Sequence, residues 1–313
     1  MAIGRHETKR DHRDPEFELK RVLAEAQLPA LPQSAIRLLE LSQDSSNGPA
    51  EFAVPIECDP GLTGQVLRFV NSSYFGFARE ISGVKLALTL VGIRTIKNFA
   101  LWSAVFSLMP NPKCGPFDLK SLWQDSLRRA IFAKAMGKLL GLDDAEEVFS
   151  GALLQDMAVP LLAKHAPGRY LELLTSRQQG SVRLSDLERR AFGWTHAEAG
   201  AMIARQWNLP DNFALLVESH VDIERWSREP NCRPEPLAVA LSALLPTTGE
   251  NGWWECAKFE ECYRRVAPAG GPTVEEILAQ VDREFTAFAP VLKIANPSKS
   301  LALRYQEAVV STG

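Results

Sequence analysis

Cysteine is scarce in this sequence, and its spacing argues against two kinds of cross-link. The 313 residues contain five cysteines, an odd number, and no C-x-x-C motif occurs among them. A disulfide framework or a structural zinc site normally draws on closely spaced, paired cysteines. We therefore expect reduced thiols that mostly pack in the interior, as in a cytoplasmic protein.

Long hydrophobic segments and an excess of one charge are also missing. The longest apolar run, Phe99 to Met109, is too short to span a bilayer, and the N-terminus has no apolar signal region. The formal net charge is −3 and the pI is about 6.0, so the chain has no overall field to attract nucleic acid or an anionic membrane. These absences predict a cytoplasmic protein without a membrane partner. Nucleic-acid binding is not expected, although the net charge does not exclude a local basic patch.

No stretch alternates apolar and polar residues as a half-buried strand does, whereas apolar residues recur at helical spacing throughout. Asp118 precedes a long predicted helix that Gly141 closes, and Asp143 with Glu146 opens the next one. A hydroxyl residue followed three positions later by glutamate predicts further helix starts at Ser185/Glu188, Thr195/Glu198 and Thr273/Glu276. The sequence therefore predicts an almost wholly α-helical protein.

Composition divides the chain into four predicted parts. Residues 1–15 are highly charged and predict a disordered tail, and the proline-rich segment 110–116 marks the best internal boundary. We predict an N-terminal helical lobe over residues 16–112, a second helical lobe over 113–225 and a C-terminal helical extension over 226–313. In this extension, Pro230, Pro234 and Pro236 are expected to interrupt the helical pattern, and residues 249–254 to form an exposed loop.

The most informative polar residue is Asp156, which follows the apolar helical stretch 148–154. A buried carboxylate without a partner is so unfavourable that it needs a metal, a cation, a cluster of donors or a proton. We expect Asp156 to lie in the interior beside such a partner.

Asp125, Gln155, His196 and His220 are the other candidates in the second half, and a helical bundle can build a metal site from such facing side chains. His196 stands at the first position of a predicted helix, where the helix dipole favours a neutral imidazole able to bind metal. The alternative is that His196 only packs or caps, and that Asp125 lies near a solvated face. His165 is expected to interact with the dipole at a helix C-terminus.

The first half has a polar group around one predicted helix. Asp59 can cap its N-terminus with Pro60 in the first turn, and Asn71 and Ser72 lie at its C-terminal end. Such residues commonly hydrogen-bond backbone groups at helix ends, so we interpret them as capping and turn residues. An aromatic turn around Gly76 follows.

Several motifs occur in one stretch of the chain, over about residues 19–220. They are Asp59-Pro60-Gly61-Leu62-Thr63, Asn71-Ser72-Ser73-Tyr74-Phe75-Gly76, Phe149 to Asp156, and His196-Ala197-Glu198-Ala199-Gly200. Together they resemble the HDOD domain, the HD-related output domain of bacterial signalling proteins. The resemblance implies an all-α fold of two helical lobes, the second similar to HD-type metal-dependent phosphohydrolases.

The resemblance also implies a degenerate metal site. Catalytic HD relatives bind metal through a long-helix His, a His-Asp pair, two further His and a late Asp. Asp125 and Gln155 stand here where the relatives have His, and no acid occurs in the segment 240–243, where the late Asp would fall. Asp156, His196 and His220 match. We expect no cofactor and no metal, because the missing ligands are those that a hydrolytic site requires. The alternative is a single ion held by Asp156, His196 and His220, with or without Asp125.

The broken ligand set and the resemblance together imply a non-catalytic signal-transduction module. It would bind a signalling protein partner or a small ligand through the cleft between its lobes. The alternative function is a metal-dependent phosphodiesterase acting on a nucleotide or cyclic dinucleotide. A third hypothesis, nucleic-acid binding by the first lobe, is disfavoured by the acidic charge balance. We expect Asp156 to be buried, close to His196 and His220, and free of metal.

Overall fold

The computed structural model describes residues 14–143, 145–179, 181–228 and 232–312. The predicted N-terminal tail lies almost wholly outside these residues, as does Pro230. Within the described part of the chain every regular element is a helix, so the all-α prediction is confirmed. None of the described helices combines the length and hydropathy needed to cross a bilayer.

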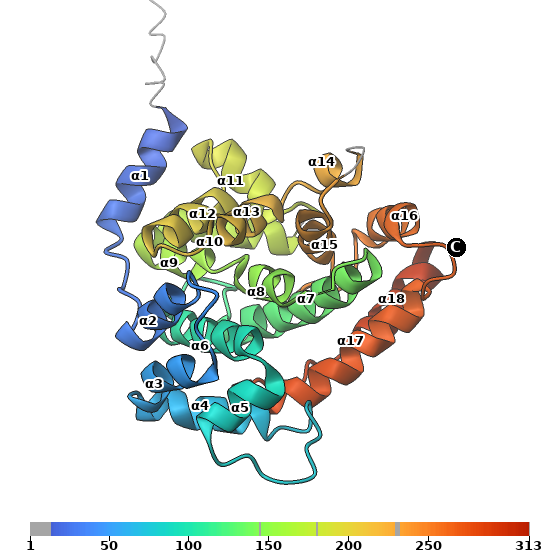
Figure 1. The fold of residues 1–313 in the computed structure, drawn as a ribbon. Helices are drawn as coiled ribbons and strands as arrows, with labels where there is room; N and C mark the ends of the chain where they lie inside the picture. Colours follow the sequence, from blue (N-terminus) through green and yellow to red (C-terminus); the bar gives the residue numbers. More distant parts are fainter. Residues whose placement is uncertain (1–13, 144, 180, 229–231, 313) are drawn as a thin grey trace, which may run out of the picture.

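The first half of the chain forms six helices that share one hydrophobic core with the rest (Figure 1). They are α1 (Pro15–Glu25), α2 (Gln33–Leu41), α3 (Pro49–Glu57), α4 (Pro60–Val70), α5 (Val84–Val91) and α6 (Ile93–Leu108).

The polar residues singled out in this half form hydrogen bonds with nearby backbone groups. The Asp59 carboxylate accepts a hydrogen bond from the backbone N of Leu62 at 3.0 Å and caps α4. Asn71 ends α4 and exchanges two hydrogen bonds with the backbone of Ile81, at 2.7 and 2.8 Å. Gly76 has φ of +64°, a conformation that favours glycine, in the turn that follows.

The second half is built around α7 (Leu119–Leu139), which packs against α8 (Glu146–Leu154) (Figure 1). The following helices are α9 (Ala158–His165), α10 (Pro167–Gln179), α11 (Leu184–Phe192), α12 (His196–Gln206), α13 (Asp211–Ser219) and α14 (Ile223–Arg228). As predicted, Asp118 caps α7 and His165 ends α9. Thr195 and Thr273 form the predicted capping boxes with Glu198 and Glu276.

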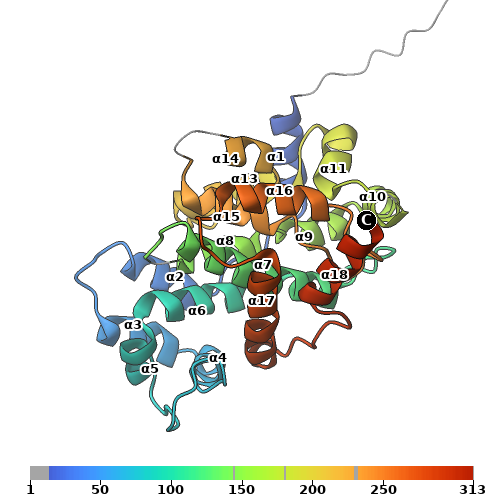
Figure 2. The ribbon, with the colours of Figure 1, turned by 90° about the vertical axis from the view of Figure 1, so that its right-hand side faces the viewer.

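The C-terminal part adds α15 (Pro234–Ser242), α16 (Cys256–Val266), α17 (Val274–Phe288), the 3-10 helix η1 (Ala289–Leu292) and α18 (Leu301–Thr312). Helix α17 packs against α7, next to which it is seen in Figure 2, and η1 at the end of α17 contacts α4 in the first half of the chain. Phe288 lies among the rings of Phe69, Tyr74 and Phe149, at centroid distances of 5.3, 5.1 and 5.8 Å. The end of α17 therefore joins helices from both halves.

Two local predictions are wrong, and a third holds except at one residue. Pro234 and Pro236 do not interrupt a helix but lie in the first turn of α15, where a missing backbone N–H costs little. The segment 249–254 is the predicted loop and is largely exposed, except that Trp253 is buried and donates a hydrogen bond to the carbonyl of Leu244 at 2.8 Å. Asp143 does not open α8, because the N-cap of that helix is Ala145.

Candidate functional site

Asp156 lies in the short turn between α8 and α9 and is 8% exposed. The buried apolar residues of α8 fix this helix against α7 and α13. Gly151 permits a close approach to α13, because an added Cβ would lie 2.7 Å from the Cβ of Leu216. The backbone carbonyl of Asp156 accepts the hydrogen bond from Val159 that begins α9. The apolar stretch thus delivers one carboxylate into the interior.

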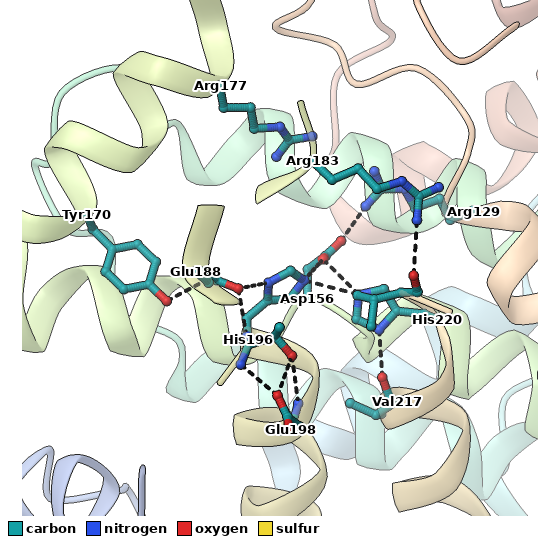
Figure 3. A network of polar contacts seen from close by, with 12 residues as sticks. Arg129, Asp156, Tyr170, Arg177, Arg183, Glu188, His196, Glu198, Val217 and His220 are labelled. Carbon is teal, nitrogen blue, oxygen red and sulfur yellow. Dashed lines mark hydrogen bonds and ion pairs between the residues drawn. The ribbon is translucent and has the colours of Figure 1, made fainter. Parts of the chain in front are cut away.

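Two buried histidines face this carboxylate (Figure 3). His196 is the first residue of α12, and its Nε2 lies 3.2 Å from Oδ1 of Asp156. His220 follows the last residue of α13, and its Nε2 lies 3.6 Å from the same oxygen. The two Nε2 atoms are 3.1 Å apart. The structure therefore brings together three of the five residues singled out in the sequence.

Each imidazole is held from behind through Nδ1. His220 Nδ1 lies 2.6 Å from the carbonyl oxygen of Val217, so this nitrogen carries a proton and donates it. His196 Nδ1 lies 2.6 Å from a carboxylate oxygen of Glu188, and its backbone N donates to the same oxygen at 2.8 Å. Tyr170 donates its hydroxyl proton to the other oxygen of Glu188 at 2.7 Å (Figure 3). Both rings thereby present Nε2 to Asp156, as metal-binding imidazoles do when a second group orients them.

The expectation of a neutral His196 is wrong. Burial by itself lowers its pKa, but the negative charges of Glu188 and Asp156 outweigh that effect and raise the pKa to about 9. Burial lowers the pKa of His220. A protonated His196 can therefore donate from Nε2 to Asp156, while the neutral His220 ring offers a lone pair.

A buried arginine accompanies the Asp156 carboxylate. Arg129 of α7 forms an ion pair and hydrogen bond with Oδ2 of Asp156. Burial of Asp156 favours its protonated form, but the Arg129 charge and the hydrogen bond from His196 hold its pKa well below the usual range. The partner that a buried carboxylate requires is therefore a cluster of cationic and polar donors.

Asp125 and Gln155 do not join this cluster. Asp125 is buried, contrary to the alternative that placed it near a solvated face, and burial raises its pKa. Its carboxylate accepts hydrogen bonds from the backbone N of Thr248 at 2.8 Å and from its hydroxyl at 2.6 Å. Gln155 is completely buried, and among the described residues neither polar atom of its side chain has a hydrogen-bond partner.

A cavity of about 160 Å³ opens above Asp156. Its lining includes Asp156, His196 and His220 on one side, and Arg129, Arg177 and Arg183 along another (Figure 3). The segment between α15 and α16, residues 243–255, closes a further side; we call it the cavity loop. The segment 240–243 supplies no acid, as the sequence shows, and reaches the cavity through Ala243.

Sequence reasoning missed most of this lining. The role of Glu188 behind His196 was also missed: the sequence predicts a capping pair with Ser185, but the N-cap of α11 is Arg183, two residues before Ser185, and Glu188 is buried. Arg129 had one usable signal, because a charged residue within an otherwise buried helix needs a partner. Arg177, Arg183 and the cavity loop carried no recognisable motif.

The ligand atoms can be tested for metal chemistry. Among the described residues, the potential ligand atoms of Asp156, His196 and His220 lie within 4.8 Å of one another. Two imidazole nitrogens and one carboxylate oxygen suit a single Zn, Mn or Fe ion. A second ion does not fit this arrangement, since Arg129 takes the other oxygen of Asp156 and Asp125 is committed to Thr248. The set can hold at most a mononuclear centre with solvent in the remaining positions.

Comparisons with known proteins agree with this architecture. Among curated proteins, the chain is 24% identical over 225 residues to a Treponema pallidum (strain Nichols) protein called "Uncharacterized protein". The match covers 70% of this chain and 43% of that relative, so the chain spans less than half of the relative's length.

Two solved structures share the fold. One is an HDOD domain protein with unknown function from Geobacter sulfurreducens, with a TM-score of 0.62, 21% identity and 96% of each chain covered. The other, from Shewanella amazonensis SB2B, is proposed to be a phosphohydrolase; its TM-score is 0.67 at 20% identity, covering 87% of this chain and 97% of that one.

The family model of the HDOD domain matches residues 28–223, which include α2 to α13 and all three residues that converge on the site. Because this match extends over more than half of the 313 residues, the chain belongs to the HDOD domain family.

Proposed function

We propose that this protein is a non-catalytic signal-transduction module that binds a small ligand in the cavity above Asp156. Membership of the HDOD family supports a signalling role. The cavity offers a bounded, polar site in which a ligand can be recognised by a few convergent groups. Binding of a signalling protein elsewhere on the surface is compatible with this role.

One observation carries the non-catalytic part of the proposal: the Arg129 guanidinium binds the Asp156 carboxylate. A hydrolytic metal site must hold its ion firmly and activate a water molecule beside it. An arginine on the central carboxylate supplies positive charge where a metal would supply it, without lowering the pKa of a bound water. With Asp125 held by Thr248 and Gln155 in place of an imidazole, the ligands are too few for a two-metal hydrolytic centre.

Metal analysis of the full chain, purified without chelator, tests this proposal. We expect far less than one equivalent of bound metal per chain, and the same metal content in wild type and Asp156→Ala. The matched control is Asp186→Ala, which removes an acid from α11 outside the cavity lining. Near-stoichiometric Mn, Fe or Zn that disappears in Asp156→Ala but persists in Asp186→Ala would overturn it.

The second candidate function is a metal-dependent phosphodiesterase with a single ion. The convergence of two oriented Nε2 atoms on Oδ1 of Asp156 favours it. When bound, the ion would polarise a phosphate ester or activate a water molecule. Asp156, His196 and His220 would hold it, while Glu188 and the Val217 carbonyl would keep both rings in the required tautomer.

A further inference from the structure

The cavity loop carries the partners of three polar side chains in the cavity wall. Thr248 holds Asp125, as described above. Glu250 lies 3.4 Å from Nη2 of Arg177, and Glu255 accepts a hydrogen bond from Nε of Arg183 at 2.7 Å. These six side chains all belong to, or directly contact, the cavity lining, and both arginines lie above Asp156 (Figure 3).

The two arginines are not saturated by the loop. Each guanidinium has five N–H donors in a planar fork. Arg183 uses one on Glu255 and one on the Val221 carbonyl at 3.3 Å, while its buried Nη2 has no partner among the described residues. The contact from Arg177 to Glu250 is long, at 3.4 Å. The wall therefore offers hydrogen-bond donors in excess of the acceptors that the loop provides.

The C-terminal helix α18 holds the loop in this position. Arg304 is 7% exposed and donates to the backbone carbonyls of Glu250 and Thr248, at 3.0 and 3.2 Å. The next residue, Tyr305, contacts the ring of Trp253 edge-on at 6.2 Å. The loop and α18 lie outside residues 28–223, so this closure is built by a part of the chain that the family model does not cover.

We propose that Glu250 and Glu255 are internal substitutes for an oxyanion ligand, and that the Arg304 contact keeps them in place. The ligand would present phosphate or carboxylate oxygens to Arg177 and Arg183 and displace the loop carboxylates. This inference rests on the proposed function, because it assigns a ligand class and a form of regulation to the same cavity. Arginine suits this role since its planar fork binds such anions through paired, charge-assisted hydrogen bonds.

The charges of the cavity lining explain why an anion must displace the loop carboxylates before it can bind. With the loop closed, each of the two arginines faces a carboxylate, so an incoming anion meets little net positive charge. When the loop carboxylates withdraw, the same arginines form an unpaired cationic pair in a partly enclosed site, where charge interactions are stronger than in water. Release of α18 from the loop and binding of the anion therefore favour each other by linkage.

Binding of inorganic phosphate to the full chain, measured by calorimetry, tests the proposal. The double variant Glu250→Gln/Glu255→Gln should bind phosphate at least about tenfold more tightly than wild type, because a neutral amide competes poorly with an anion for arginine. Adding Arg177→Gln and Arg183→Gln to that variant should abolish the gain. The matched control is Glu261→Gln, an exposed acid on α16 that pairs with Arg265 four residues later. Acetate, titrated in parallel, shows whether a carboxylate serves as well as a phosphate.

Arg304→Gln tests the role of α18 independently, because this substitution leaves every charged residue of the cavity lining in place. It should speed amide hydrogen exchange in residues 247–254 by roughly tenfold or more and tighten phosphate binding. Arg265→Gln is its control. If the double glutamate variant does not fold, Glu255→Gln alone tests the same competition.

Unchanged phosphate affinity in the folded glutamate variants would overturn the inference, as would a gain that survives loss of both arginines. This readout is separate from that of the proposed function, which fails instead on stoichiometric metal or metal-dependent hydrolysis by the wild-type chain.

Discussion

Glu188 binds His196 at two points, because one carboxylate oxygen accepts hydrogen bonds from both the backbone N and the ring Nδ1 of that residue. The carboxylate is completely buried and also accepts the Tyr170 hydroxyl proton. This contact fixes the ring orientation of His196 and stabilises its protonated form. It makes Glu188 as important to the site geometry as the residues that the sequence motifs pointed to.

We predict that Glu188→Gln lowers the pKa of His196 from about 9, because it removes a buried negative charge while keeping a hydrogen-bonding side chain. In wild type the folded-state pKa lies above the unfolded value of about 6.5. The resulting stabilisation is fully present below pH 6.5 and is lost as pH rises through about 9. Histidine NMR titration and denaturant unfolding of chelator-treated protein measure the two effects. A wild-type pKa at or below 6.5 would contradict this prediction.

Gly151→Ala should destabilise the protein by about 1–3 kcal/mol, since overpacking outweighs the gain in helix propensity. The added Cβ would lie 2.7 Å from the Cβ of Leu216, which would push α8 and α13 apart next to the site. Gly168→Ala in α10 is the matched control, because its added Cβ meets no atom within 4 Å. Urea unfolding compares the two. Equal effects would show that the α8–α13 contact is not as close as described.

Phe288→Ala should cost about 3–5 kcal/mol, as expected for a large ring removed from a core. Phe288 is 3% exposed and contacts aromatic rings from both halves of the chain. Val310→Ala, in the same C-terminal part but at an 81% exposed position, should leave the free energy of unfolding almost unchanged. Thermal and urea unfolding of both variants provide the comparison. A loss below 1 kcal/mol for Phe288→Ala would mean that this segment is not part of the cooperative core.

Asn71→Ala should destabilise the first half of the chain by about 1–3 kcal/mol, because it leaves backbone groups of Ile81 without their partner. The side chain lies in a turn and takes no part in the cavity lining. Phosphate affinity should therefore be unchanged while the unfolding midpoint falls. Ser73→Ala is a suitable control, since within the described part of the chain its hydroxyl makes one long hydrogen bond, at 3.4 Å. A specific loss of binding in Asn71→Ala would assign this motif a function beyond structure.

Local signals in the sequence predicted the helices well. The capping pairs Thr195/Glu198 and Thr273/Glu276 form as expected, and Asp59 and Asp118 cap the helices that follow them. These signals succeed because a cap depends on residues only a few positions apart. The same pattern at Ser185/Glu188 failed, since spacing alone cannot distinguish an acid on a helix surface from one that faces the core.

The convergence of Asp156, His196 and His220 was expected, but the partners that decide their chemistry were not. Arg129 lies on α7, a helix buried around most of its surface, so no polar face in the sequence indicated which way the side chain points. Thr248 reaches Asp125 across 123 positions of sequence, and Arg304 reaches the cavity loop from the last helix. Contacts of this kind depend on how helices pack, and a single sequence gives no periodic or local signal for them.

Hydrolysis by the purified full chain tests the central claim most directly. The substrates are bis(p-nitrophenyl) phosphate and a cyclic dinucleotide, each assayed with added Mn²⁺, Fe²⁺ or Zn²⁺. We predict turnover no greater than that of Asp156→Asn, because Arg129 already pairs with the Asp156 carboxylate that a metal would need. Metal-dependent turnover by the wild type that disappears in Asp156→Asn would contradict a non-catalytic role.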